Sequence, residues 1–368
     1  MLQQSTSVWR YFDLWLTAAV LLLTSYGVLM IRSAVTGAPA FATFPQRQIT
    51  FAVLGFIVML VMASIDYRYL TASHWYIYIG LVASLVFVVA AGAINNDARR
   101  WISLGFIEVQ PSELGRILLA ISFAQFLANR QQYITHFSNT IITLLYIGLP
   151  ISLIFIQPDL GMSIVFVIMW FTMIWLAGLP LSHFIVLAIT GTIGIILILP
   201  FLSPYQLNRI TTFIDPASDP EQAFNVDQAM ISIGSGGFWG KGYLQGTQSQ
   251  LGFLRVQHTD FIFSMLTEEM GLIFGSVVVL GLMGFIVIRL IKIAAMTSDP
   301  AGRYIVTGIA GVFFFQTFVS VGMNVRLLPV TGLTLPFVSY GGSSLVTLFM
   351  AIGVAQSVRM RHRKQEFG

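Results

Sequence analysis

Long apolar segments are the feature that most constrains how this chain can fold. Only 9% of its 368 residues are charged and 56% are hydrophobic, and its mean hydropathy is +0.82. A soluble protein has about a quarter of its residues charged, whereas about 20 consecutive apolar residues suffice for a helix that crosses a bilayer. The composition therefore excludes a soluble protein and predicts a polytopic membrane protein.

Ten apolar segments are long enough to be membrane spans. We therefore expect an all-α polytopic membrane protein with about ten transmembrane helices, whose two termini lie on the same side. The expected spans are approximately residues 11–31, 48–65, 75–93, 112–128, 137–156, 160–178, 181–202, 261–291, 304–323 and 342–358.

The connection between the seventh and eighth spans, about residues 203–259, is much longer than the others. Loops of this length are usually functional or disordered. Aromatic and apolar residues occur throughout this one, so we expect an ordered, functional loop. Because no repeat or low-complexity tract divides the chain, we expect residues 1–368 to form a single integral membrane domain.

Basic residues near the helix ends predict the orientation. With the termini on one side, ten of the 19 lysines and arginines fall on that side and nine on the other, which is no bias. The basic tail from Arg359 to Lys364 follows the last span directly and indicates cytoplasmic termini. The long loop would then be extracellular. The basic residues on the outer side would be available to bind an anion.

Composition also narrows the chemistry. The chain has no cysteine and five histidines without close pairing, which excludes thiol nucleophiles and does not favour a zinc site. A net charge of +4 is ordinary for a protein that faces anionic lipid, and it does not indicate a nucleic-acid partner.

One stretch, from Ser235 to Gly271, changes from a glycine-rich polar segment into an apolar helix. We expect Thr259 to be the N-cap and Asp260 to lie in the first helical turn, where the macrodipole favours a carboxylate. On a helix, Asp260 would share a polar stripe with Ser264, Thr267 and Glu268. Such a stripe must face protein or water, so we interpret it as the wall of an active site at the membrane surface.

Two acidic residues beside predicted helix starts have alternative interpretations. Glu113 and Arg116 are three residues apart after Pro111, and they would form an ion pair that holds the bundle, line a substrate cavity, or do both. Asp159 in the turn Gln157–Gly161 would cap the next helix, or would coordinate a cation or orient a basic residue.

The long loop and the last connection contain further candidates. Arg209 has no acid within four residues, and its guanidinium suits a bidentate phosphate contact; the alternative is a pair with an acid elsewhere in the loop. The glycines of 234–242 could cradle a phosphate near Lys241 or serve as hinges. The irregular apolar segment 324–344 would form a cavity wall, or would simply pack.

Together these motifs resemble those of the SEDS family of shape, elongation, division and sporulation proteins. They occur in the same order as in that family and span nearly the whole chain. The matching pieces are Arg100-Trp-Ile, Gln110-Pro-Ser-Glu, Gln157-Pro-Asp-Leu-Gly, residues 205–209, residues 236–242, His258-Thr-Asp-Phe-Ile-Phe263 and Pro336-Phe-Val-Ser-Tyr-Gly-Gly342.

The resemblance implies a multi-pass enzyme of the bacterial cytoplasmic membrane that polymerises lipid II into peptidoglycan glycan strands. The essential aspartate of the family matches Asp260. Arg100 and His258 stand in matching motifs, and Arg326 lies in the irregular segment 324–344. With Arg209, Lys241, Glu113, Arg116 and Asp159 they are the candidate substrate-binding residues. The resemblance also implies a class B penicillin-binding protein as the cross-linking partner.

Within the family, residues 246–250 and the short N-terminus resemble the elongation members more than the division members. Two positions depart from the family pattern. Arg116 stands where a lysine is usual, so proton transfer by that residue is implausible. Arg255 lies in a stretch where the family often has an acid, which leaves any role of that acid in doubt.

The implied reaction needs a sugar hydroxyl to attack an anomeric carbon while undecaprenyl pyrophosphate leaves. Asp260 would be the general base, and Arg209, Lys241 or a divalent cation (Mg²⁺ or Mn²⁺) would stabilise the leaving group. The α donor linkage and β product require a single inverting step. No cofactor is certain. Three alternatives remain: a lipid II flippase, a division or sporulation polymerase, and a non-enzymatic scaffold.

Overall fold

The computed structural model describes residues 8–95, 98–103 and 108–362, and it is overwhelmingly helical. In the N-terminal half the helices are α2 (Leu14–Ala34), α3 (Phe44–Ser64), α4 (Tyr67–Ala72), α5 (His74–Ala91), α6 (Pro111–Ala128), α7 (Phe137–Ile156) and α8 (Leu160–Leu176). They are followed by α9 (Leu181–Ile198), α10 (Pro204–Ile214), α11 (Pro220–Gly236), α12 (Thr247–Gln250), α13 (Ile262–Gly271), α14 (Val278–Met296), α15 (Pro300–Asn324) and α16 (Gly342–Arg361).

Every expected span corresponds to a helix, which confirms an all-α membrane protein. Among the described residues, seven helices are long and apolar enough to cross a membrane, and α8 and α9 contain shorter apolar stretches. Helix α6 contains the charged pair Glu113 and Arg116 near its start. The count of ten spans therefore stays a prediction.

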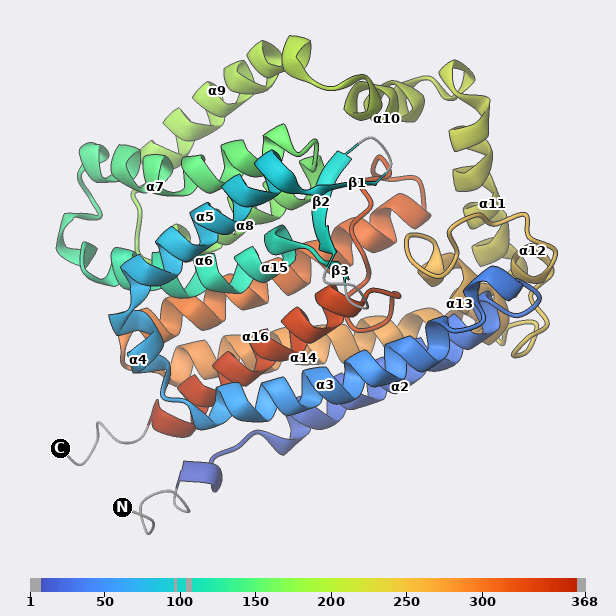
Figure 1. Ribbon diagram of the computed structural model, residues 1–368, viewed down its shortest axis with the longest axis horizontal. Helices are drawn as coiled ribbons and strands as arrows, with labels where there is room; N and C mark the ends of the chain where they lie inside the picture. The colour runs from blue at the N-terminus through green and yellow to red at the C-terminus, as the bar shows by residue number, and fades with distance from the viewer. Residues whose placement is uncertain (1–7, 96–97, 104–107, 363–368) are drawn as a thin grey trace.

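The long helices run side by side between two ends of a bundle (Figure 1). Both ends of the chain lie at one end of the bundle, whereas α10, α11 and α12 lie at the other. Helix α16 packs closely on α3, because glycines remove side chains from the contact: a Cβ at Gly353 would lie 2.5 Å from the Met59 carbonyl oxygen. Small residues allow this close approach in membrane bundles.

The segment between α9 and α13 contains helices α10, α11 and α12, so the expected loop has regular structure in this part of the chain. The connection between α5 and α6 contains three short strands that the sequence analysis did not anticipate. Strands β1 (Ala93–Asn95), β2 (Ala98–Ser103) and β3 (Glu108–Val109) pair antiparallel in the order β1-β2-β3. They lie beside the end of the bundle that is farther from the termini (Figure 1).

Helix α9 stands apart from the other long helices (Figure 1). Residues 188–194 are exposed around the whole helix, and its large apolar side chains include Ile189 and Ile193, which are 58% and 52% exposed. A helix that is apolar on all sides needs protein or lipid around it. In a membrane protein, lipid fills that role for α9.

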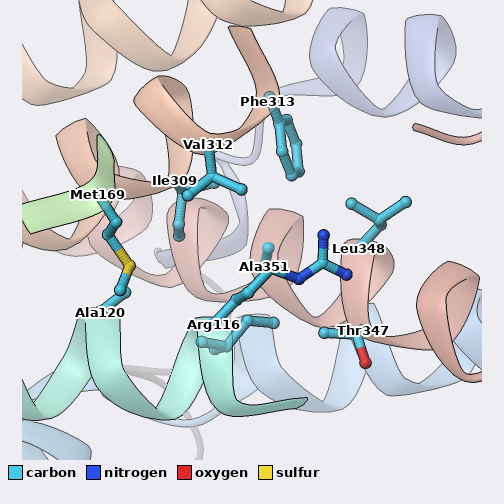
Figure 2. Close-up of a pocket in the computed structure, with 10 residues that line it drawn as sticks. Arg116, Ala120, Met169, Ile309, Val312, Phe313, Thr347, Leu348 and Ala351 are labelled. Carbon is cyan, nitrogen blue, oxygen red and sulfur yellow. The ribbon is translucent and has the colours of Figure 1, made fainter. Parts of the chain in front are cut away.

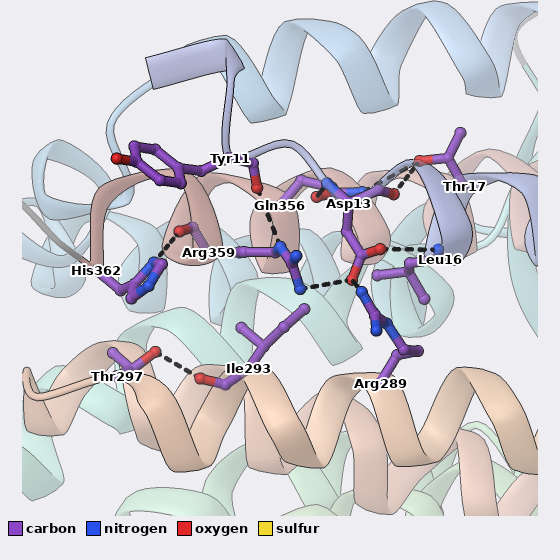
Figure 3. A network of polar contacts seen from close by, with 10 residues as sticks. All are labelled: Tyr11, Asp13, Leu16, Thr17, Arg289, Ile293, Thr297, Gln356, Arg359 and His362. Atoms are coloured by element: carbon purple, nitrogen blue, oxygen red, sulfur yellow. Dashed lines mark hydrogen bonds and ion pairs between the residues drawn. The ribbon is translucent and has the colours of Figure 1, made fainter. Parts of the chain in front are cut away.

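At the end of the bundle where α2 begins and α16 ends, the carboxylate of Asp13 links three helices (Figure 3). One of its oxygens accepts hydrogen bonds from Arg289 Nε at 2.9 Å and Arg359 Nη1 at 2.7 Å. The other oxygen caps α2 through the Leu16 N–H at 3.2 Å. Gln356 completes the contact by bonding both the N–H and the carbonyl oxygen of Asp13, each at 2.9 Å. Helices α2, α14 and α16 therefore meet at one buried carboxylate.

This network predicts a large effect of Asp13→Ala on stability, because the substitution leaves two largely buried guanidinium groups without their carboxylate. We expect a loss of about 3 kcal/mol, measured as thermal unfolding in detergent. Glu221→Gln is the matched control, since its pair with Arg255 is exposed and should contribute about 1 kcal/mol or less. Equal effects of the two substitutions would contradict the assigned role of Asp13.

Candidate functional site

Asp260 lies in the turn that precedes α13, not in the helix itself. Helix α13 begins at Ile262, and its N-cap residue is Phe261, which makes no side-chain capping bond. The hydroxyl of Thr259 instead points back to the Val256 carbonyl oxygen, at 3.4 Å. The expected N-cap at Thr259 and the expected first-turn position of Asp260 were therefore wrong. Asp260 is half-buried at this helix entrance.

Hydrogen bonds to three successive carbonyl oxygens hold this turn to the end of α15 and to the segment that follows it. The three donors are an amide at the last residue of α15, and a hydroxyl and a backbone N–H of the segment between α15 and α16. The three bonds are Tyr340 N to His258 O at 2.9 Å, Ser339 Oγ to Thr259 O at 2.8 Å, and Asn324 Nδ2 to Asp260 O at 2.9 Å.

Asn324 is the central residue of this contact and is completely buried. Besides donating to Asp260, its amide oxygen accepts bonds from the Ser264 N–H at 3.1 Å and from Ser264 Oγ at 2.6 Å. The side chain thus fixes both the Asp260 backbone and the first turn of α13. The sequence analysis did not single out Asn324. The only available signal was an amide at the end of a long apolar span.

Arg209 of α10 approaches this carboxylate. Burial raises the pKa of Asp260 above its ordinary value, while the positive charge of Arg209 and a hydrogen bond with Thr259 act to lower it. Burial likewise raises the pKa of Asp159, and the charges of Arg100 and Arg209 oppose that shift. Arg209 therefore interacts electrostatically with both acids, and neither of them lies in the long loop where its alternative partner was expected.

Arg100, Asp159 and Arg209 line one hollow at this end of the bundle, together with Gln206 and Thr331. The volume that it encloses is small, about 30 Å³, and the hollow is partly open to solvent. The structure thus brings together three candidate residues predicted from separate motifs. A basic hollow beside a half-buried carboxylate can bind an anion and accept a proton.

Two walls of the hollow are fixed by hydrogen bonds. Arg100 donates to the Gln157 carbonyl oxygen at 2.9 Å and to the Pro158 carbonyl oxygen at 2.6 Å. Asp159 caps α8 through the Met162 N–H at 3.1 Å and accepts a bond from Gln110 at 3.0 Å. The capping alternative for Asp159 is therefore confirmed, and its cap also orients its carboxylate beside the arginines.

Arg326 lies across a neighbouring pocket that Arg209 also lines. Its guanidinium pairs with Asp227 at 2.8 Å.

Within the described residues, no group of three or more histidine, aspartate or glutamate side chains is arranged to hold a metal ion.

Glu113 and Arg116 form an ion pair in the first turns of α6, which confirms the pairing alternative. Both side chains are buried. Arg116 also lines a cavity whose other walls are mostly apolar side chains of α6, α8, α15 and α16, including Met169, Phe313 and Leu348 (Figure 2). The pair therefore lies within the bundle, next to a cavity separate from the basic hollow.

Lys241 has an acidic partner that is distant in the sequence. Its ammonium bonds Glu268 at 2.8 Å and Thr247 at 2.6 Å. The fully buried Glu268 also accepts bonds from the backbone N–H groups of Gln248, at 2.8 Å, and Ser249, at 3.1 Å. Glu268 thus organises the loop around α12 and does not face a substrate cavity.

The glycine-rich segment packs against the end of α13. The N–H groups of Lys241 and Gly242 donate to the carbonyl oxygens of Glu268 and Glu269, at 3.0 and 2.9 Å. At Gly240, where φ is +83°, an added Cβ would lie 2.2 Å from the Glu269 carbonyl oxygen. These N–H groups are therefore already bonded, and the phosphate-cradle interpretation was wrong for them.

The rest of the expected polar stripe is also internal. Ser264 bonds Asn324, and Thr267 bonds the Ser276 hydroxyl at 2.8 Å; both are buried. Interpreting the whole stripe as an active-site wall was therefore wrong, although Asp260 at its start lies at the basic hollow.

His258 packs among aromatic rings. Its ring centroid lies 5.2 Å from those of Phe41 and Phe44 and 6.0 Å from that of Tyr340. Burial lowers the pKa of His258 below its ordinary value. The aromatic contacts support the turn that carries Asp260.

Comparison with known proteins gives consistent similarities over the whole chain. The family model described as "Cell cycle protein", for FtsW, RodA and SpoVE, matches residues 11–364. The peptidoglycan glycosyltransferase MrdB of Escherichia coli (strain K12) is 40% identical over 322 residues, which cover 87% of this chain and 86% of MrdB.

Two solved structures share the fold. A chain from a peptidoglycan synthase complex, described as coordinating polymerization and crosslinking, matches with a TM-score of 0.82 and 29% identity. The match covers 97% of this chain and 99% of that chain. The rod shape determining protein RodA of Thermus thermophilus matches with a TM-score of 0.72 and 27% identity, covering 96% and 98% of the two chains.

Proposed function

This chain belongs to the cell cycle protein family of FtsW, RodA and SpoVE, and on that premise we propose that Asp260 is the general base of its reaction. The protein is a multi-pass inner-membrane peptidoglycan glycosyltransferase of the RodA type, which polymerises lipid II into glycan strands during cell elongation. The observation that supports Asp260 is its place: half-buried, in a turn fixed by three carbonyl bonds, beside the basic hollow.

The chemistry requires a proton acceptor. A sugar hydroxyl of the acceptor attacks the anomeric carbon of the donor, and Asp260 takes the hydroxyl proton as the new bond forms. Burial raises the pKa of Asp260, which makes its carboxylate a stronger base than an exposed aspartate. One displacement converts the α linkage into a β linkage, so the reaction needs no second carboxylate as nucleophile.

The leaving pyrophosphate carries the largest negative charge of the reaction. Arg209 is our candidate for the main contact because it lines the hollow and its planar guanidinium matches phosphate oxygens. Arg100 lines the same hollow. For Lys241 to act as the weaker second contact proposed from the sequence, its ammonium would have to leave Glu268. The remaining candidates, Glu113, Arg116, His258 and Arg326, would support or extend the binding surface.

Substrate access follows from the arrangement of α9. Lipid II carries a long undecaprenyl tail, which must stay in lipid while its pyrophosphate enters the hollow. Helix α9 is surrounded by lipid and leads into α10, which carries Arg209. We propose that the tail lies beside α9. With both termini cytoplasmic, the hollow opens on the outer side of the membrane.

We propose that residues 1–368 act as one membrane domain and that a class B penicillin-binding protein cross-links the product. One structural relative comes from a complex that coordinates polymerization and crosslinking, which supports such a partner. A flippase is the second candidate, and the buried pair Glu113–Arg116 within the bundle favours it. Purified protein with lipid II in detergent separates the two functions, because only a polymerase makes product without separate compartments.

Asp260→Asn preserves size but removes the base. We expect glycan synthesis to fall by about 10²–10⁴-fold, measured on purified protein with lipid II, while thermal unfolding in detergent changes little. In the parent protein, activity should decline on acidification through the raised pKa of Asp260, because only the ionised carboxylate accepts a proton. Near-normal synthesis by the asparagine variant would exclude Asp260 as the base.

Arg209→Lys keeps the charge but loses the planar guanidinium and its paired donors, so it should weaken activity. Arg209→Ala should weaken activity further, by roughly 1.5–3 kcal/mol in transition-state stabilisation. Arg209→Ala should also move the acidic limb of the activity profile to higher pH, since the charge that lowers the pKa of Asp260 is gone. Lipid II titrations at several pH values measure both effects. Wild-type rates throughout would place the phosphate contact elsewhere.

Asn324 should act by positioning Asp260. Asn324→Leu removes the bonds to Asp260 O and Ser264, and we expect at least a tenfold lower kcat with a smaller change in KM for lipid II. Gln356→Leu, which also removes a completely buried and bonded amide but at the opposite end of the bundle, controls for general destabilisation. If Asn324→Leu lowers thermal stability but leaves kcat and its pH profile unchanged, Asn324 is only structural.

A further inference from the structure

A second polar site lies at the end of the bundle that holds both termini, where α6 turns into α7. It is an open pocket of about 410 Å³, lined by Arg130, Tyr133, His136, Ser138, Asn139 and Ile142. None of these residues takes part in the proposed reaction. From this pocket we propose that the protein binds the phosphate of a membrane phospholipid headgroup.

Asn139 is the first observation that points to a ligand. Its side chain is 2% exposed, yet neither its amide nitrogen nor its amide oxygen has a hydrogen-bond partner in the described structure. An unpaired buried polar group costs about 1–3 kcal/mol, and this residue contains two such atoms. A ligand in the pocket that Asn139 lines would provide the missing partner.

The charge around the pocket favours an anion. Arg130 stacks on Phe126, with its guanidinium carbon 4.9 Å from the ring centroid, and it makes no ion pair within the described chain. No acidic residue occurs anywhere in residues 114–158. The positive charge of Arg130 is therefore not balanced by its neighbours in the sequence.

The start of α7 adds backbone donors. Helix α7 has 20 residues, and its N-cap residue, His136, makes no side-chain bond to the first turn. The free N–H groups and the macrodipole of a helix N-terminus favour a phosphate. Ser138 in the first turn adds a hydroxyl to the same pocket.

The surroundings favour a lipid over a free phosphate. Ile142 lines the pocket, and below it Leu145 and Leu149 continue along the same face of α7, 70% and 47% exposed. These apolar side chains would contact an acyl chain directly below the headgroup. Tyr133 and Phe137, 49% and 44% exposed, occupy the level at which aromatic residues anchor membrane proteins.

Delipidated full-length protein in detergent provides the test, with binding followed by thermal shift and native mass spectrometry. Phosphatidylglycerol should raise the melting temperature, phosphatidylcholine should do so less because its headgroup has no net negative charge, and inorganic phosphate at equal concentration should have no effect. Arg130→Gln should weaken phosphatidylglycerol binding about tenfold or more. Lys292→Gln, which removes an exposed charge from α14, should leave it unchanged.

Asn139→Leu gives a sharper result because it removes the unpaired atoms themselves. Without lipid the variant should melt at the same or a higher temperature than the parent protein, and it should lose most of the shift produced by phosphatidylglycerol. An undiminished lipid shift in both Arg130→Gln and Asn139→Leu would overturn the proposal. An equal shift with inorganic phosphate would assign the pocket to free phosphate and exclude the lipid.

Discussion

Lipid offers no hydrogen bonds, and this constraint governs the whole molecule. Backbone groups at membrane depth must be bonded within the protein, so helices supply most of the structure and every break in a helix needs its own partners. The turn before α13 meets that requirement with three donors from the end of α15 and the segment that follows it. The same bonds that make the break tolerable hold the catalytic candidate Asp260 in place.

Much of the fold follows from composition, because an apolar run of sufficient length has few alternatives to a helix in a membrane. The candidate site was only partly predictable. Among the predicted candidates, Arg100, Asp159 and Arg209 do line one hollow, and Asp260 interacts with it through the charge of Arg209. Their neighbours in space come from separate helices, so sequence spacing alone could not indicate that they meet.

The errors have a common physical origin in contacts that are distant in sequence. Lys241 looked unpaired because Glu268, its partner, is 27 residues away. The glycines of 234–242 suggested a phosphate site, but Gly236 and Gly240 allow close packing on α13. Thr259 had the residue type of an N-cap, yet its position is set by Ser339 from the last connection. Asn324 was overlooked because an isolated amide beside an apolar span has no local signature.

The isolation of α9 ties the enzyme to the thickness of its membrane. The helix has 18 residues, about 27 Å at 1.5 Å per residue, slightly less than the hydrocarbon core of about 30 Å. With few protein neighbours, its tilt follows hydrophobic mismatch with the surrounding bilayer. Because α10, which carries Arg209, follows α9 after a single 3-10 turn, a bilayer that changes the tilt of α9 would also act on the segment that holds Arg209 at the basic hollow.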